Sequence, residues 1–351
     1  MVERSVAPKG TSIGWGLVGC GWVARDYVAP AMQRAPNSHL VAACDLDSAA
    51  LNAIVPGEKI LRTQHFDELL SAPGLDAVYI ATPNDSHRAL TEAAASAGKH
   101  VFCEKPMATC YDDAVAMVRA CERAGVQYAT AFDQRFHALH IALRAAIASG
   151  VLGTVTTIRV HYACWLPPDW AKDNWRADPK RAGGGAFIDL APHGLDLVQS
   201  LLGETLEDVQ VLLQRRVFDY AVDDGAVVIG RFPSGTLALL NVAYNCPEGY
   251  PRRTLEILGT KAKADAVDTM GQTPGGRVHL TTASGVRTEL TVAAADDESP
   301  FQKGIERFAR SLLEGTPFPY LPSVDLHTAW LLDLTRCGIE NKQARRAVSA
   351  S

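Results

Sequence analysis

Apolar runs and helical patterns alternate along the first third of the chain. Five apolar runs have the length and composition of buried strands, at residues 13–18, 40–44, 77–81, 100–103 and 127–131. Helical patterns separate them, one running to about Arg34, one over residues 85–98 and one over residues 109–124. This alternation predicts an α/β domain with a doubly wound parallel sheet, whose ligand crevice lies at the carboxyl ends of the strands.

From about Gly150 the pattern changes to strand-like runs, several of which follow one another without an intervening helix. The runs cover residues 155–162, 209–216, 226–232, 237–244 and 254–258. They predict an α+β domain built on a largely antiparallel open sheet. Two later helical patterns, over residues 301–313 and 324–341, are expected to cover a face of the first or the second domain.

Composition sets broad limits on what the chain does. Its 351 residues are 47% hydrophobic and 21% charged, as in ordinary globular proteins with two domains. Lys and Arg total 34 against 39 Asp and Glu, without a basic stripe, so a nucleic-acid partner is not expected. No apolar run is long enough to span a bilayer, and residues 1–10 lack the apolar core of a signal peptide. We therefore expect a cytoplasmic protein with no membrane partner.

The eight cysteines and ten histidines do not point to a metal site. No Cys-x-x-Cys pair occurs, and the histidines form no cluster at a recognisable ligand spacing. Cys20, Cys44 and Cys103 lie in or beside predicted strands and turns, and Cys121 and Cys337 lie on helical patterns. Buried, reduced thiols and no catalytic metal are the expectation.

A glycine-rich turn follows the first predicted strand and opens a helical pattern. It reads Gly19-Cys20-Gly21-Trp22-Val23-Ala24. Gly19 would form the tight turn, Gly21 would let the backbone meet a pyrophosphate, and Ala24 would let the helix lie close to the strand. The phosphates would then lie at the helix N-terminus. The turn therefore predicts a dinucleotide site, with an ordinary strand-turn-helix as the alternative.

The second predicted strand ends on Asp45, which favours the dinucleotide interpretation. Its carboxylate can accept hydrogen bonds from an adenosine ribose and would repel a 2′-phosphate, so NAD is expected in preference to NADP. We therefore divide the chain into a disordered tail (residues 1–12), a dinucleotide-binding Rossmann domain (13–135) and a substrate-binding and oligomerisation domain (136–351).

Three further segments carry reactive side chains. Two follow predicted strands of the first sheet, and the third follows three glycines: Thr82-Pro83-Asn84-Asp85-Ser86-His87, Glu104-Lys105-Pro106, and Gly183-Gly184-Gly185 with Asp189 and His193. On a helix, Asp189 and His193 would lie one turn apart on the same face. The glycines would let backbone or ligand approach closely. Pro106 restricts the backbone of Lys105 to extended conformations, so the cation would project from a stiffened loop.

These side chains suit proton transfer coupled to hydride transfer. If the crevice holds a nicotinamide, Lys105 would donate to a substrate oxygen and His193 would take or give the hydroxyl proton. Asp189 would orient the imidazole or hold a neighbouring hydroxyl. The alternatives are that Asp189 and His193 form a solvated helix face, and that Lys105 is a surface lysine paired with Glu104.

Together these segments resemble the glucose-fructose oxidoreductase, inositol dehydrogenase and rhizopine-catabolism (Gfo/Idh/MocA) family. The similarity covers roughly residues 13–203, in the family's order, and includes Gln134-Arg135-Phe136. The resemblance implies that Lys105, Asp189 and His193 are the catalytic residues. It also implies that Glu104 and the Thr82-Pro83-Asn84 loop with His87 lie beside the nicotinamide, next to the turn with Trp22 and Val23.

The resemblance implies a small polyhydroxylated substrate, namely a sugar, a sugar derivative or a cyclitol, and a homodimer or homotetramer. Residues 164–181 are rich in Trp, Pro, Asp and Lys. Trp165, Trp170, Trp175 and Arg176 could cover a sugar ring, or the tryptophans could equally pack the loop or a subunit interface. Arg135, Tyr162 and Tyr250 are further candidate substrate contacts, and Tyr244 could also reach the pocket.

Three functions remain open from the sequence. The leading one is an NAD-dependent dehydrogenase that oxidises a secondary alcohol or reduces the matching ketone. Some members of the family instead retain NAD and hydrolyse glycosides by transient oxidation, elimination and re-reduction. The third is a non-catalytic sensor of nucleotide and sugar, against which the presence of Lys105, Asp189 and His193 argues.

Overall fold

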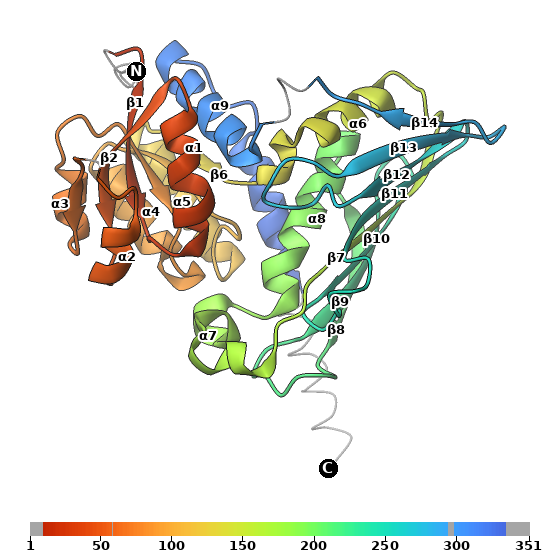
Figure 1. Ribbon diagram of the computed structural model, residues 1–351, viewed down its shortest axis with the longest axis horizontal. Helices are drawn as coiled ribbons and strands as arrows, with labels where there is room; N and C mark the ends of the chain where they lie inside the picture. The colour runs from red at the N-terminus through yellow and green to blue at the C-terminus, as the bar shows by residue number, and fades with distance from the viewer. Residues whose placement is uncertain (1–9, 58, 294–297, 335–351) are drawn as a thin grey trace.

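The computed structural model describes residues 10–57, 59–293 and 298–334. Most of the predicted tail over residues 1–12 lies outside the described residues, as do Cys337 and the end of the helical pattern over residues 324–341. Figure 1 shows two halves side by side, a parallel sheet with its helices at the left and a large second sheet at the right.

The first half is built on a parallel sheet, as predicted, but the sheet has six strands where the sequence showed only five apolar runs; β3 was not predicted. Its order is β3-β2-β1-β4-β5-β6. The strands are β1 (Ile13–Val18), β2 (Ser38–Cys44), β3 (Leu61–Thr63), β4 (Ala77–Ile80), β5 (His100–Cys103) and β6 (Tyr128–Thr130). Strands β1, β4 and β5 are buried along their whole length, which is why they read as continuous apolar runs.

Helices cover both faces of this sheet. They are α1 (Ala29–Arg34), α2 (Ser48–Ala53), α3 (Phe66–Leu70), α4 (His87–Ser96) and α5 (Tyr111–Ala124). Helix α1 continues a π-helical turn, η1 (Ala24–Val28), that ends two residues before Pro30. Proline has no N–H for the α-helical hydrogen bond, and such widened turns accommodate this. The helix nevertheless begins directly after the glycine turn, as a dinucleotide site requires.

The second half is built on an eight-stranded sheet of order β14-β13-β12-β11-β7-β10-β9-β8. Its strands are β7 (Val155–Ala163), β8 (Glu207–Gln214), β9 (Gly225–Arg231), β10 (Leu237–Ala243), β11 (Arg253–Gly259), β12 (Ala262–Val267), β13 (Arg277–Thr282) and β14 (Arg287–Leu290). Only β7 and β10 pair in parallel; the other pairs are antiparallel. The predicted class is confirmed, whereas β12 to β14 were not predicted from the sequence.

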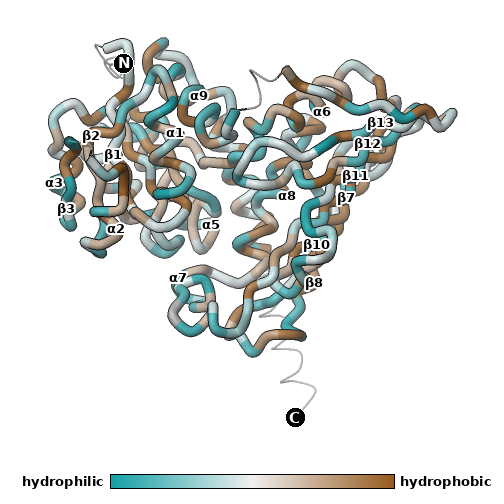
Figure 2. Tube along the Cα trace, viewed as in Figure 1, coloured by the Kyte–Doolittle hydropathy of each residue, from teal (hydrophilic) through white to brown (hydrophobic). Residues whose placement is uncertain are grey.

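Helix α8 (Ala186–Leu202) lies across the inner face of this sheet, beside α6 (Ala138–Ala148). Strand β10 alternates over residues 237–242, with Ala238, Leu240 and Val242 buried and Leu237 and Leu239 exposed. Figure 2 shows hydrophobic segments recurring along α8 and the neighbouring strands. The sheet therefore has one face buried against α8, and its outward face carries exposed leucines at β10.

After the second sheet, the described part of the chain returns to the first half. Helix α9 (Pro300–Glu314) contributes Phe301, Ile305 and Phe308 to the core beside α1, where Phe308 stacks on Phe102. A further helical segment, residues 322–334, contributes Leu331 and Leu332 to the core of the second half and Ala329 to a core of the first. Among the described helices, none is long and apolar enough to cross a membrane.

Candidate active site

A cavity of about 630 Å³ lies where the carboxyl ends of the parallel strands face α8. One end is lined by the glycine turn after β1 and by Asp45 after β2. The other end is lined by Lys105 after β5 and by Asp189 and His193 on α8. The topology therefore brings the separately predicted segments to one cavity, as expected for the strand ends of a doubly wound sheet.

The glycine turn has the shape that a dinucleotide requires. Gly19 has a φ of +86°, and a Cβ atom there would lie 2.6 Å from the carbonyl oxygen of Ala81, so only glycine fits. Gly21 lines the cavity, and a Cβ atom at this position would meet nothing within 4 Å. The space in front of Gly21 is therefore free for a ligand to approach the backbone closely. The residues present fit a bound pyrophosphate at the start of the helix.

Asp45 is fixed by the same turn. Its Oδ2 accepts a hydrogen bond from the Cys20 N–H at 2.6 Å, and its Oδ1 accepts one from the Asp47 N–H at 2.8 Å. Leu46, Gln64 and Phe66 line the cavity around it. Among the described residues lining this end there is no Lys or Arg, so a negative charge stands where an adenosine ribose would lie.

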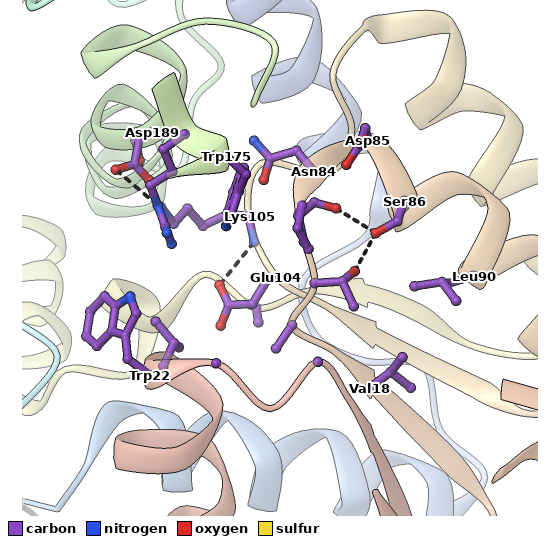
Figure 3. Close-up of a pocket in the computed structure, with 18 of the residues that line it drawn as sticks. Val18, Trp22, Asn84, Asp85, Ser86, Leu90, Glu104, Lys105, Trp175 and Asp189 are labelled. Atoms are coloured by element: carbon purple, nitrogen blue, oxygen red, sulfur yellow. Dashed lines mark hydrogen bonds and ion pairs between the residues drawn. The ribbon is translucent and has the colours of Figure 1, made fainter. Parts of the chain in front are cut away.

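Lys105 and Asp189 form an ion pair across the cavity. The Lys105 Nζ donates to Asp189 Oδ1 at 2.9 Å and to the Asp189 carbonyl oxygen at 2.8 Å. Asp189 Oδ2 accepts a hydrogen bond from the Tyr244 hydroxyl at 2.9 Å and lies 4.0 Å from Arg176 Nε. Figure 3 shows Lys105 reaching from its loop toward Asp189, with Glu104 nearby. The ammonium is thus held at the cavity wall rather than exposed on the surface.

Burial and neighbouring charges set the protonation of the two carboxyls here. Burial alone would raise the pKa of Asp189, but the charges of Lys105 and Arg176 outweigh it and hold that pKa well below its usual range. Burial raises the pKa of Glu104 to about 7, although Lys105 and the Tyr79 hydroxyl, 2.8 Å from Glu104 Oε1, oppose the rise. Asp189 is therefore ionised, whereas Glu104 titrates near neutral pH.

His193 is held by a different carboxylate from the one expected. Its Nδ1 lies 3.1 Å from Asp133 Oδ1, and its ring packs edge-on against Tyr162 at 5.2 Å. Asp189, one turn earlier on α8, bonds to Lys105 and Tyr244 instead. The expectation that Asp189 would orient the imidazole is therefore wrong. Asp189 holds a neighbouring hydroxyl, that of Tyr244, and positions the lysine.

The three glycines before α8 allow a backbone contact. A Cβ atom on Gly185 would lie 2.0 Å from the Asp223 carbonyl oxygen, and the Asp223 carboxylate accepts hydrogen bonds from the N–H groups of Gly185 and Phe187. These contacts satisfy N–H groups at the start of the helix, which would otherwise have no partner. They fix the start of α8, one turn before Asp189.

A strap formed by residues 164–183 crosses one side of the cavity. It contributes Trp175 and Arg176, whose guanidinium stacks 4.4 Å from the Trp175 ring, to the cavity lining. The Ala182 carbonyl oxygen accepts a hydrogen bond from Asn84 Nδ2 at 2.8 Å. The strap of the second half is thereby tied to the loop after β4.

Comparisons with known proteins agree with this geometry. Residues 13–132 match the model of an oxidoreductase family with an NAD-binding Rossmann fold, and residues 140–265 match that of the GFO/IDH/MocA C-terminal domain. The chain belongs to the GFO/IDH/MocA oxidoreductase family. Among its relatives is 1,5-anhydro-D-fructose reductase of Ensifer adhaerens, 34% identical over 77% of this chain and 80% of that protein.

Two further similar proteins extend the comparison. Inositol 2-dehydrogenase of Rhizobium meliloti is 29% identical over 85% of this chain and 90% of its own. The crystal structure of aldose-aldose oxidoreductase from Caulobacter crescentus, complexed with glycerol, superposes with a TM-score of 0.84 at 26% identity, covering 94% of this chain and 98% of that one. The chain is thus an oxidoreductase with an NAD(P)-binding Rossmann domain.

Most of the site residues predicted from the sequence line the cavity of this GFO/IDH/MocA protein. They are Gly19, Gly21, Trp22, Val23, Asp45, Thr82, Pro83, Asn84, Glu104, Lys105, Tyr162, Trp175, Arg176, Asp189 and His193. His87 lies behind them, where its buried ring is within hydrogen-bond distance of the carbonyl oxygens of Thr82 and Pro106. It joins the two loops without lining the cavity.

Two predicted substrate contacts lie elsewhere. Arg135 is buried in ion pairs with Asp196 and Asp325, and Tyr250 is 64% exposed outside the cavity lining. Neither position supports contact with a substrate in the cavity. The tryptophans differ in position. Trp175 lines the cavity, where it could cover a sugar ring, whereas Trp165 and Trp170 pack on Phe218, Tyr220 and Tyr244.

Several lining residues were not predicted from the sequence. Asp133 follows β6, so the rule that strand ends carry ligand-binding residues could have found it. Gln272 and Phe301 come from a loop after β12 and from α9, and no local pattern marks them. Within the described ranges, no three His, Cys, Asp or Glu side chains gather as a set of metal ligands.

Proposed function

We propose that this protein is an NAD-dependent oxidoreductase that interconverts a secondary alcohol and the matching ketone of a sugar, a sugar derivative or a cyclitol. The observation that carries the proposal is the convergence of Lys105, Asp189 and His193 on one end of the cavity, with the glycine turn and Asp45 at the other. The relatives support the substrate class, since they are named for an anhydrosugar, an inositol and aldoses.

Lys105 and His193 would take separate tasks. Lys105 would donate a hydrogen bond to the substrate oxygen, because its ammonium is fixed by Asp189 at the cavity wall. His193 would accept the hydroxyl proton during oxidation and return it during reduction. A bound nicotinamide supplies the hydride acceptor or donor. Trp175 offers an aromatic face to the apolar face of a sugar ring.

The proposal of NAD rather than NADP rests on Asp45. A 2′-phosphate beside this carboxylate would meet a like charge, and no compensating Lys or Arg stands among the described residues lining that end. The hydroxyls of a free ribose would instead find a fixed hydrogen-bond acceptor. The described cations that line the cavity lie elsewhere: Lys105 is on the loop after β5, and Arg176 and Arg181 are on the strap.

We also infer a homodimer or homotetramer. The outward face of the second sheet carries Val227, Ile229, Leu237 and Leu239, each between 38% and 49% exposed. The pairing of β9 with β10 places them side by side. An apolar patch of this kind is costly to leave in water, so a second copy of the chain is the expected cover.

The test is a panel of sugars, anhydrosugars and cyclitols offered with NAD and with NADP, read as the absorbance of reduced nicotinamide. Formation of NADH with at least one polyol, in proportion to the ketone formed, is the expected result. Release of an aglycone from a glycoside without net NADH would instead identify a glycosidase that retains its cofactor. Binding of NAD and sugar with no conversion in either direction would leave only a sensor.

A further inference from the structure

Asp133 and His193 form a buried contact between the two halves of the molecule. Asp133 lies on η3 (Asp133–Phe136), directly after β6, and belongs to the first half, whereas His193 lies on α8 of the second. Asp133 is 5% exposed and His193 is 7% exposed, yet both line the cavity. The Asp133 Oδ2 also accepts a hydrogen bond from Gln134 Nε2 at 2.9 Å, so the carboxylate is held from both sides.

The charge of Asp133 decides which nitrogen of His193 carries the proton. Burial alone would raise the pKa of Asp133, but the charge and hydrogen bond of His193, aided by Gln134 and Lys105, lower it below its ordinary value. An ionised carboxylate can only accept hydrogen bonds, so the His193 Nδ1 must be the donor. The neutral ring then has Nε2 bare, and this nitrogen is the one left to meet a substrate in the cavity.

A buried ion pair also connects the segments that carry Asp133 and His193. Arg135, two residues after Asp133, donates from Nε to Asp196 at 2.9 Å, and Asp196 lies three residues after His193 on α8. The Arg135 and Asp196 side chains are each 1% exposed. Arg135 also pairs with Asp325, whose other oxygen accepts a hydrogen bond from the Thr130 N–H at 3.0 Å. The start of η3 is therefore held against α8 one turn beyond the histidine.

We infer that Asp133 is the positioning residue of His193: it fixes the tautomer with Nε2 facing the substrate, and Arg135 and Asp196 hold the two segments in register. This inference rests on the proposed function, in which His193 moves the hydroxyl proton. During oxidation the substrate O–H proton passes to Nε2, and the imidazolium then keeps its Nδ1–H on Asp133. During reduction the same proton returns to the new hydroxyl. Asp133 stays ionised throughout.

Other ionisable groups share this region, and the test has to separate them from Asp133. They are Tyr162 on β7 with Arg253 beside it, Lys105 and Glu104 after β5, and Asp189 on α8 itself. Asp133→Asn leaves all of these in place, keeps the size of the side chain and keeps an acceptor oxygen, but removes the charge. Asp133→Ala also removes the acceptor.

The first experiment compares pH profiles of kcat/KM for alcohol oxidation in the intact protein. With Asp133→Asn, the acidic limb should move down by about one pH unit, because an opposite charge this close favours the charged imidazole. With Asp133→Ala, kcat should fall by about 100-fold while KM changes less, as for loss of an oriented base. Asp76→Asn is the matched control, since Asp76 accepts the Gly14 N–H at the opposite end of the sheet. An acidic limb unchanged in Asp133→Asn, or moved equally in Asp76→Asn, would overturn the inference.

The second experiment does not depend on turnover. Long-range ¹H–¹⁵N spectra of the protein labelled at histidine, with His193 identified by its loss in His193→Ala, report which ring nitrogen is protonated. The neutral ring should be protonated at Nδ1 in the wild type and should become a mixture of tautomers in Asp133→Ala. A wild-type ring protonated at Nε2 would refute the assignment even if the enzyme proved active. If no sugar or cyclitol of the panel were converted but His193 showed the expected tautomer, only the proposed function would be refuted.

Discussion

Replacing Lys105 by Met tests the catalytic end of the cavity most directly. The substitution keeps the unbranched stem and removes the ammonium, which donates to Asp189 at 2.9 Å and to the Asp189 carbonyl at 2.8 Å. Without it, Asp189 retains the Tyr244 hydroxyl at 2.9 Å and Arg176 at 4.0 Å. The carboxylate therefore loses the nearer of its two cationic partners among the described residues and keeps only Arg176 at 4.0 Å.

The expected cost to catalysis exceeds the expected cost to stability. Loss of one donor to the reacting oxygen lowers kcat by about 100- to 1000-fold, or ~3–4 kcal/mol in the barrier. The side chains of Lys105 and Asp189 are 14% and 25% exposed, so the pair lies between a surface and a buried ion pair. Breaking it should lower the free energy of unfolding by about 1–3 kcal/mol.

The assay combines steady-state kinetics on the best substrate with NAD titration by fluorescence and with denaturant unfolding. The dissociation constant for NAD should stay within about threefold, because the glycine turn and Asp45 lie at the other end of the cavity. Lys99→Met is the matched control: its Nζ donates to the Leu75 carbonyl at 2.9 Å, outside the cavity lining. A Lys105→Met enzyme with kcat within about threefold of the wild type would refute the role given to the ammonium.

Three further predictions follow from other parts of the molecule. Asp45→Asn keeps an acceptor but removes the charge, so the ratio of kcat/KM for NAD over NADP should fall by about tenfold or more; an unchanged ratio would contradict the proposed preference. Because burial raises the pKa of Glu104 to about 7 from 4.5, the folded state binds the extra proton and stability falls as pH rises between these values. Between about pH 5 and pH 8, the free energy of unfolding should therefore fall by about 1–2 kcal/mol less in Glu104→Gln than in the wild type. Urea titrations that show equal falls in the two proteins would exclude this effect of Glu104. Ile229→Glu with Leu239→Glu should yield monomers in light scattering, and an intact oligomer would place the interface elsewhere.

The fold followed from the sequence wherever side-chain contrast was strong. Strands β1 and β5 are buried throughout and their ends coincide with the apolar runs. Strand β12 was not predicted because its inward residues include Ala264 and Ala266. These small residues alternate with charged ones and give little hydrophobic contrast. Strand β14, at the edge of the sheet, is mostly exposed and gives no apolar signal.

The sequence predicted most of the residues that line the site but not the contacts that they make with one another. Helical spacing placed Asp189 and His193 on one face, and α8 does present both to the cavity. Spacing could not reveal their partners, because Lys105 and Asp133 arrive from loops that are distant in sequence. Arg135 shows the same limit: a charged residue after a strand predicts a ligand contact, whereas here it is committed to two buried carboxylates.

The partners come from opposite halves of the molecule, and this determines what the site can do. Lys105 and Asp133 extend from the parallel sheet, and Asp189 and His193 extend from α8, so each of these two contacts also ties the two halves together. The groups that would move the proton are therefore held by these two contacts relative to the strand ends, where a nicotinamide would lie. A substitution that breaks either pair alters protonation and domain placement together. Measuring kcat, KM and the pH profile side by side separates these two effects, since loss of charge moves the profile whereas loss of alignment lowers kcat.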